Sequence, residues 1–394
     1  MRNITGQIVE GDDFFPREQD VQRYIATLAT ENVKLVFPRR SGKSSFVLHL
    51  AGRLKGEGWL VAEANVEDCP TELDFVRRLL ERLAANGIET SWLNRLRNSL
   101  NSQVASVKVG SFLEVKTQST VASAHATLRD EVETLFRTLD AGPRSILIAL
   151  DEFPEVLQQI ANPQPDGPQR LQNFLHWLRQ LRLTYRQRVR WILYGSVGLD
   201  SFLERYGLAA LVNDLKPLEL TPLTVKEAHQ FLTRLAEGQE LQLKPRVCQD
   251  VLNRIGWRLP YFLQLMFDAL RGLNATTLES RHVDQAFRLL LSPERLIHFD
   301  TWHQRLERQF GSDDLRAARL ILLQLCQSPG GHSKQKLLEY LMDQRPNHDP
   351  LVVQHQLTSL LITLQREGYL MADDSQVAFR SFLLRDFWRS RFVL

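Results

Sequence analysis

The chain has 394 residues, of which 43% are hydrophobic, and its formal net charge is only +3. This length allows two or three domains with cores of their own. A charge so close to neutrality neither predicts nor excludes nucleic-acid binding, because a local basic patch would be diluted in the total. The cysteines, Cys69, Cys248 and Cys326, form no CxxC pair, which favours a reducing cytosol without a structural metal. No apolar run is long enough to cross a bilayer, so we expect a cytoplasmic protein without a membrane partner.

Residues 14–28 begin with two aromatic residues, Phe14 and Phe15, and continue as an amphipathic helix. The segment after this helix is the most informative of the chain. Residues 36–45, VFPRRSGKSS, follow an apolar run and match the functional end of the phosphate-binding pattern GxxxxGK(S/T). The first glycine of the pattern is replaced by Phe37, so the opening turn of the loop departs from the pattern.

Each residue at the functional end of this loop has a chemical role. Backbone N–H groups and the N-terminus of the next helix surround the phosphates, and Lys43 adds a positive charge. Gly42 lets the backbone approach without a Cβ, and Ser44 offers a hydroxyl to Mg²⁺. The same letters could also be an ordinary polar helix start capped by Ser41. The residues that the loop would place against a nucleotide are Pro38, Arg39, Arg40, Ser41, Gly42, Lys43, Ser44 and Ser45.

Helices and strands alternate in the next hundred residues. Helices at 45–54, 71–86 and 128–139, with a strand at 58–66, predict a parallel sheet that is covered on both faces. Between the last two helices, residues 104–118 alternate apolar and polar side chains, which predicts a β-hairpin insertion.

A second chemical signal is the aliphatic run 145–153, SILIALDEF. It predicts a strand buried on both faces, and its end places Asp151 and Glu152 at the carboxyl edge of the sheet, where open α/β sheets bind ligands. Asp151 is therefore the candidate Mg²⁺ ligand, together with Ser44. Glu152 is the candidate base for the water that attacks the γ-phosphate. A strand followed by a helix-capping acid is the alternative, but the order of the two motifs favours nucleotide binding and hydrolysis.

A third strand, at 189–194, ends at the same edge. Ser196 follows it and could hydrogen-bond the attacking water or the γ-phosphate, although Gly-Ser after a strand is also a common turn. A Pro-rich loop at 162–169 and a helix at 171–188 precede this strand. An arginine of the helix could reach the nucleotide of a neighbouring copy, but a solvated helix face is the favoured interpretation. The arginines are Arg179, Arg182, Arg186 and Arg188.

From residue 221 the expected strands give way to helices. Apolar periodicity predicts helices at 221–238, 245–254, 259–270 and 280–291. Arg258, before the third of these, is the nearest cation that could face a nucleotide, although an arginine in a loop is more often solvated.

Residues 312–394 predict a winged helix, with helices at 315–327, 333–344 and 350–367 followed by two short strands. This region has ten Lys and Arg against nine acids, a net charge of +1. Because docking on DNA needs surplus positive charge, a protein-docking winged helix is favoured over a DNA-binding one.

The expected fold class is therefore α/β. Residues 1–216 would form a P-loop parallel sheet flanked by helices, with the hairpin inserted. Residues 217–311 would form an all-helical lid, and residues 312–394 the winged helix.

The motifs together resemble the prokaryotic archaeal-type ATPases of the AAA+/STAND assemblage. The likeness rests on PRRSGKSS, LIALDEFPEVL, ILYGSVG, GWRLPYFLQL and FRSFLLRDFWRSRF, in the family's order across nearly the whole chain. It implies that an FFxRE box lies by the adenine, with Phe15, Arg17 and Glu18 near the base and Pro16 at the usual glycine. It also implies that Ser196 occupies the sensor-1 position, and that ATP closes the lid and winged helix over the sheet.

These interpretations predict a molecular switch that binds and slowly hydrolyses ATP, with Mg²⁺ as cofactor. Its nucleotide state would control assembly with a separately encoded protein partner, and a homo-oligomer could form. One alternative is a DNA-binding ATPase of the loader, origin or transposition type that uses its winged helix. A second alternative, suggested by Phe37, is a nucleotide-bound scaffold without turnover.

Overall fold

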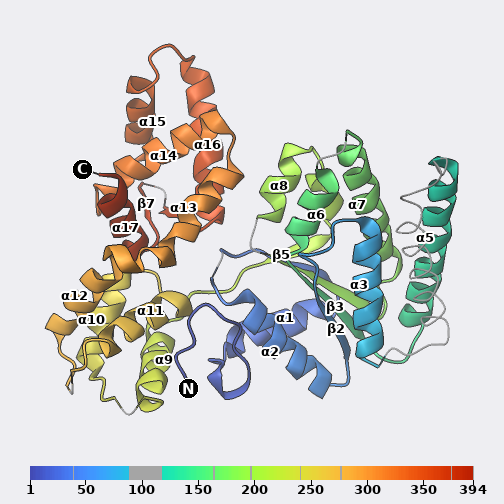
Figure 1. The fold of residues 1–394 in the computed structure, drawn as a ribbon, viewed down its shortest axis with the longest axis horizontal. Coiled ribbons are helices and arrows are strands. Elements are labelled where there is room, and N and C mark those ends of the chain that lie inside the picture. The colour runs from blue at the N-terminus through green and yellow to red at the C-terminus, as the bar shows by residue number, and fades with distance from the viewer. Residues whose placement is uncertain are drawn as a thin grey trace, which may run out of the picture. The chain divides into compact units, whose positions relative to one another are not determined.

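The computed structural model describes residues 1–38, 40–87, 118–162, 165–195, 198–239, 241–275, 277–373 and 375–393, except the side chains of 118–128 and 308. They form two compact units (Figure 1). The sheet unit comprises Pro16–Val36 and Lys43–Leu220, and the helical unit comprises Met1–Phe15, Phe37–Gly42 and Thr221–Leu394. The predicted hairpin at 104–118 lies almost wholly outside the described residues. The predicted three-domain division stays a prediction.

The sheet unit contains one five-stranded parallel sheet in the order β2-β3-β4-β1-β5. Its strands are β1 (Asn32–Leu35), β2 (Leu60–Asn65), β3 (Ile146–Asp151), β4 (Val189–Leu193) and β5 (Leu215–Leu218). Its helices are α1 (Glu18–Leu28), α2 (Lys43–Gly56), α3 (Glu72–Ala85), α5 (Gln118–Asp140), α6 (Phe153–Ala161), α7 (Gly167–Thr184), α8 (Leu199–Arg205) and η3 (Ala209–Val212). The predicted parallel sheet flanked by helices is confirmed.

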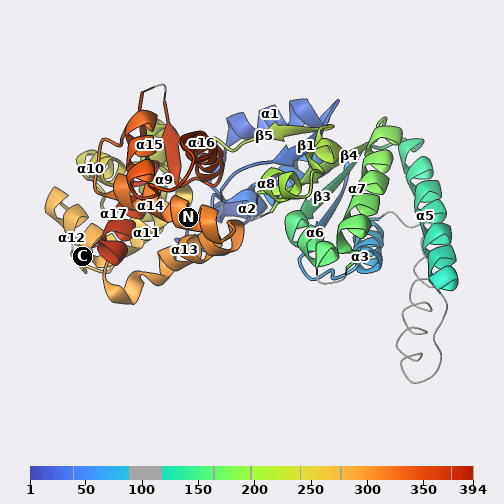
Figure 2. The ribbon, with the colours of Figure 1, turned by 90° about the horizontal axis from the view of Figure 1, so that it is seen from above.

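Helices cover both faces of this sheet (Figure 2). On one face, buried residues of α3, α5, α6, α7 and α8 pack with alternate residues of the strands, such as Leu150 of β3 and Trp191 of β4. Trp191 stacks on Phe136 of α5, with ring centroids 5.6 Å apart. Helices α1 and α2 pack against the strands from the other face. Because side chains alternate along a strand, Asp151 and Tyr194 point toward this second face.

Strand β5 is an element that the sequence analysis missed. It has only four residues, contains Lys216 and Pro217, and pairs with β1 alone. A proline removes a ladder donor and is tolerated at a sheet edge, so the strand gives no clear signal in the sequence. It also crosses the expected boundary between residues 216 and 217.

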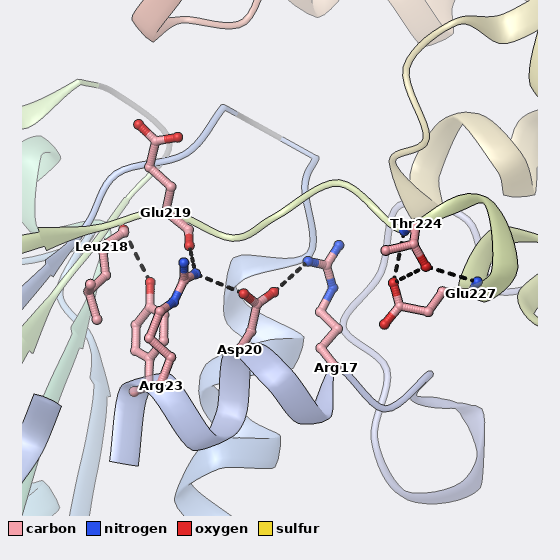
Figure 3. Close-up of polar contacts among 8 residues, drawn as sticks. Arg17, Asp20, Arg23, Leu218, Glu219, Thr224 and Glu227 are labelled. Atoms are coloured by element: carbon pink, nitrogen blue, oxygen red, sulfur yellow. Dashed lines mark hydrogen bonds and ion pairs between the residues drawn. The ribbon is translucent and has the colours of Figure 1, made fainter. Parts of the chain in front are cut away.

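Helix α1 is fastened to the chain around β5 (Figure 3). Asp20 of α1 accepts hydrogen bonds from Arg17, at 3.1 Å, and from Arg23, at 2.7 Å. Arg23 also donates to the carbonyl of Glu219, and the Tyr24 hydroxyl donates to the carbonyl of Leu218 at 3.1 Å. These bonds hold the start of α1 against the edge of the sheet.

Two other predictions for this unit need correction. Helix α7 begins at Gly167, inside the expected loop, because Pro168 fits the first turn of a helix, where no N–H is needed. It ends at Thr184 rather than at 188. Helix α5 begins at Gln118, ten residues before the predicted start.

The helical unit contains the predicted run of helices. They are η1 (Gly11–Asp13), α9 (Val225–Glu237), α10 (Pro245–Ile255), α11 (Pro260–Arg271), α12 (Ser280–Leu290), η4 (Pro293–Arg295), α13 (Ile297–Gln309), α14 (Ser312–Cys326), α15 (Lys334–Asp343), α16 (Pro350–Arg366) and α17 (Phe382–Phe392). Thr224 and Glu227 form a capping box that starts α9 (Figure 3). Helices α13 and α17 were not predicted.

The region that begins with α14 has the expected order of elements. Helices α14, α15 and α16 precede β6 (Leu370–Ala372) and β7 (Val377–Phe379), which pair antiparallel. Helix α13 packs onto this region, because Tyr369 donates to the carbonyl of Trp302 at 2.6 Å and Arg305 forms a buried ion pair with Glu367 at 2.6 Å. The assignment of this arrangement as a winged helix stays a prediction.

Candidate nucleotide-binding site

The loop after β1 leads directly into the N-terminus of α2. Gly42 has φ of 87°, a conformation that side chains with a Cβ rarely adopt, and Lys43 is the first residue of the helix. Lys43 and Ser45 are buried, at 8% and 6% exposure. The first N–H groups of a helix have no partner within the helix and carry a partial positive charge, so this end of α2 suits an anion.

The first turn of α2 is joined to the end of β3. The Ser44 hydroxyl donates to Oδ2 of Asp151 at 2.6 Å, although 107 positions separate the two residues. Burial raises the pKa of Asp151, and the charge of Glu152 raises it further, whereas the bond from Ser44 and the charge of Lys43 act against this rise. A hydroxyl and a carboxylate are oxygen ligands of the kind that Mg²⁺ prefers, so these two residues fit that ion.

Glu152 follows Asp151 in an unusual backbone conformation. Its φ of 55° is in the left-handed region, and its N–H donates to Oδ1 of Asp151 at 2.9 Å. The next N–H, of Phe153, donates to the carbonyl of Tyr194 at 3.0 Å. The chain therefore turns sharply after β3, and the end of β4 holds the turn in place.

Tyr194 is a residue of this edge that the sequence analysis did not single out. It is buried, and burial raises the pKa of its hydroxyl well above the usual value, with further contributions from the charges of Asp151, Glu63 and Glu152. The hydroxyl therefore stays protonated near three carboxylates. The alternation along β4 could have revealed it, because Tyr194 lies two and four positions after Ile192 and Arg190 and shares their face.

The opening half of the loop contacts other parts of the helical unit. The ring of Phe37 packs edge-to-face against Trp257, with centroids 6.2 Å apart. The guanidinium of Arg40 lies over the ring of Tyr261 at 4.8 Å. Ser41 donates to the carbonyl of Pro38 at 2.7 Å. The bulky residue in place of the usual glycine therefore has a packing partner.

The residues predicted near the base have these partners. Phe15 packs edge-to-face on Phe231, with centroids 5.4 Å apart, and Arg234 lies over its ring. Arg17 pairs with Asp20, as described above, and Glu18 accepts hydrogen bonds from Gln22 of α1 and from Arg53 of α2. These contacts leave the predicted adenine site untested.

The structure gives contacts for two of the remaining candidates, Arg258 and Arg182. Arg258 donates to the carbonyl of Leu223 at 2.6 Å. Arg39 and Ser196 lie outside the described residues. Arg182 is 1% exposed and makes two hydrogen bonds to Asp214, at 2.7 and 3.0 Å, so it is part of the core rather than a solvated helix face.

Comparisons with known proteins agree with this architecture. The sequence model of a family described as "Novel STAND NTPase 1" matches residues 7–372. Among solved structures, a Walker-type ATPase of Pyrococcus abyssi is similar over 99% of this chain and 100% of its own, with a TM-score of 0.62 and 13% identity. The ORC2 protein of Aeropyrum pernix, solved as ADPNP–ADP complexes, is similar over 98% of both chains, with a TM-score of 0.50 and 13% identity. A search of proteins with curated descriptions found no significant match.

Proposed function

The chain belongs to the novel STAND NTPase 1 family of P-loop NTPases, and from that premise we propose that it is a switch that binds ATP with Mg²⁺ and hydrolyses it slowly. The observation that carries this proposal is the Ser44–Asp151 hydrogen bond, which joins the phosphate loop's helix to the strand that ends in Asp151 and Glu152. This bond supports the proposal because a hydroxyl, the adjacent carboxylates of Asp151 and Glu152 and a helix N-terminus lie at one edge of the sheet, and phosphoryl transfer needs such groups together.

In the proposed reaction, Lys43 and the N–H groups of α2 would bind the phosphates, and Ser44 and Asp151 would hold Mg²⁺. That ion would supply positive charge to neutralise the charge that develops on the phosphate oxygens. Glu152 accepts a proton from the attacking water. The water oxygen bonds to the γ-phosphorus as the bond to the bridging oxygen breaks, and ADP and phosphate leave.

We propose further that the nucleotide state controls docking of a separately encoded protein partner in the cytoplasm. The exposed face of α16 supports a protein rather than DNA as that partner, because Leu351, Val352 and Ile362 are 74%, 59% and 44% exposed. The helix contains one cation, Arg366, which lies in its last turn. A helix that docks in DNA needs cations along its length to neutralise phosphates.

The first test is phosphate release from the purified protein with Mg²⁺-ATP, alone and with duplex DNA, with size-exclusion chromatography of the same samples. A slow rate that DNA does not change, with an ATP-dependent change in size, is expected for the switch. Stimulation of the rate by DNA would instead favour the loader-type alternative. Bound nucleotide without phosphate release would favour the scaffold.

The α16 face has its own test. Leu351→Ser together with Ile362→Ser should weaken the ATP-dependent change in size and leave phosphate release unchanged. Leu183→Ser is the matched control, because Leu183 is a similarly exposed residue of α7, at 46%. An unchanged assembly in the double variant would exclude this face from docking.

A further inference from the structure

Gly195, two residues after β4, lies against the side chain of Glu152. A Cβ built on Gly195 would lie 3.2 Å from Oε2 of Glu152, 3.2 Å from its Cα and 2.6 Å from Cδ of Pro154. Contacts below about 3.0 Å are essentially never made by a Cβ, and at 3.2 Å the neighbour must move. Only glycine at this position lets the Glu152 side chain and the start of α6 occupy the places they have.

The backbone just before Gly195 is fixed by hydrogen bonds of Tyr194 to the end of β3 and to the turn that follows it. The N–H of Tyr194 donates to the carbonyl of Leu150 at 3.1 Å, and the N–H of Phe153 donates to the carbonyl of Tyr194 at 3.0 Å. These bonds extend the β3–β4 pairing past the Leu150–Leu193 pair and across the turn at Glu152. The residue after β4 therefore helps to fix the backbone of the turn that contains Glu152, the residue proposed as the base.

We infer that Gly195, with the Tyr194 carbonyl, is a positioning residue for hydrolysis, which sets where the Glu152 carboxylate lies relative to the attacking water. This inference rests on the proposed function of Glu152. The left-handed backbone of Glu152 persists only where the surrounding structure supports it, and the neighbouring Tyr194 carbonyl and Gly195 are part of that support. A displacement of about 1 Å at such a site can lower a rate by about a hundredfold without a change in the groups present.

The test is Gly195→Ala. We expect kcat for ATP hydrolysis to fall by about a hundredfold, in line with the cost of such a displacement, while the Kd for ATP changes less than about twofold because Lys43 and α2 are not touched. Gly142→Ala is the matched control, because a Cβ there would also be crowded, at 3.1 Å from the carbonyl of Leu139, but has no contact with Glu152. It should lower stability without changing kcat.

A thermal measurement without nucleotide separates this inference from the proposed function. Gly195→Ala should lower Tm less in a Glu152→Ala background than in the wild type, because the Oε2 atom that meets the new methyl group is gone. Additive Tm changes would overturn the inference, as would a kcat near that of the wild type. A wild-type protein that releases no phosphate would instead overturn the proposed function, and the Tm comparison would still test the contact.

The variant could fail to fold because of the 2.6 Å approach to Pro154. In that case Gly195→Ala is combined with Pro154→Ala, which removes this contact and keeps the one to Glu152. A kcat that stays about a hundredfold below that of Pro154→Ala alone supports the positioning role. A kcat equal to that of Pro154→Ala alone overturns it.

Discussion

Lys43 and Glu152 have separable roles at the scale of single residues, because one would contact the phosphates and the other the attacking water. Lys43→Ala removes a charge-assisted bond worth about 1.5–3 kcal/mol, so the Kd for ATP should rise about ten- to a hundredfold. Glu152→Gln should keep ATP bound and lower the rate by about 10²–10⁴-fold, because a neutral amide cannot accept the proton.

Nucleotide affinity by fluorescence titration and phosphate release by a coupled assay distinguish the two variants. An unchanged rate in Glu152→Gln would remove this residue from the role of base. Unchanged affinity in Lys43→Ala would leave the polar helix start, rather than a phosphate loop, as the better interpretation.

Arg182 is expected to matter for stability rather than for turnover. It is buried, pairs with Asp214 and also donates to the carbonyl of Leu211 at 2.9 Å. Arg182→Ala leaves the Asp214 carboxylate without this partner, so the free energy of unfolding should fall by about 3–5 kcal/mol.

Urea denaturation measures that loss, and phosphate release per folded molecule should stay at the wild-type level. Arg186→Ala is the control, because Arg186 is exposed and lies two residues after the end of α7. A lower rate in a stably folded Arg182→Ala protein would reopen a role for this arginine at the nucleotide.

At the scale of elements, the second half of the phosphate loop follows the sequence motif, whereas the first half has a contact that the motif does not predict. Gly42 immediately precedes α2, and Lys43 and Ser44 are its first two residues, so the functional end of the motif leads into a helix as predicted. The opening half could not be predicted, because the partner of Phe37 is Trp257, more than two hundred positions away in the sequence. A motif describes local geometry and has no information on such a contact.

Phe37→Ala should therefore be a stability variant. Loss of a buried phenyl ring, at 8% exposure, should lower the free energy of unfolding by about 3 kcal/mol, because the cavity is only partly refilled. Affinity for ATP should persist, because Lys43 and Ser44 are retained. Calorimetry with and without ATP measures both effects, and a loss of binding in folded protein would show that Phe37 serves the nucleotide directly.

The strands show why some elements were predicted and others were not. β3 is buried on both faces, so its aliphatic run marks it clearly. β5 lies at the edge, where polar residues and a proline are tolerated, and it was missed. α7 started earlier than expected because a proline that usually marks a loop also fits a helix start.

At the scale of the whole molecule, one buried and three partly buried histidines predict how the free energy of unfolding depends on pH. Burial is the main cause that lowers the pKa of four histidines below the usual value of about 6.5: His49, His298, His303 and His332. The unfolded chain therefore binds more protons than the folded one as pH falls below about 6.5, and stability should decrease there. Above this pH their contribution should be constant.

Urea denaturation at pH 8.0, 6.5 and 5.5 tests this expectation. His332→Gln should make the decrease smaller, because His332 is buried next to Ser328. The same change at His355, which is exposed on α16, should leave the decrease as it is. Equal or higher stability at pH 5.5 would contradict the predicted direction.

Along the described chain, no helix is long and apolar enough to span a bilayer. The described residues divide into a unit built on the sheet and a unit built of helices, and the loop Phe37–Gly42 belongs to the second although its neighbours in sequence belong to the first. The sequence motif alone treats this loop as one piece with α2.

The class of fold and the chemical groups of the candidate site are predictable from local sequence patterns. A phosphate loop and an aliphatic strand that ends in two acids are local patterns, since each is set by the spacing of a few residues. Which of these groups meet depends on the folded chain, because strand order is a property of long-range pairing. β4 lies between β1 and β3, so its end supports Glu152, and Ser44 reaches Asp151 only after the sheet is assembled. Gly195 shows the same limit. A side chain at this position would collide with Glu152 and Pro154, which follow β3 and are far from Gly195 in the sequence.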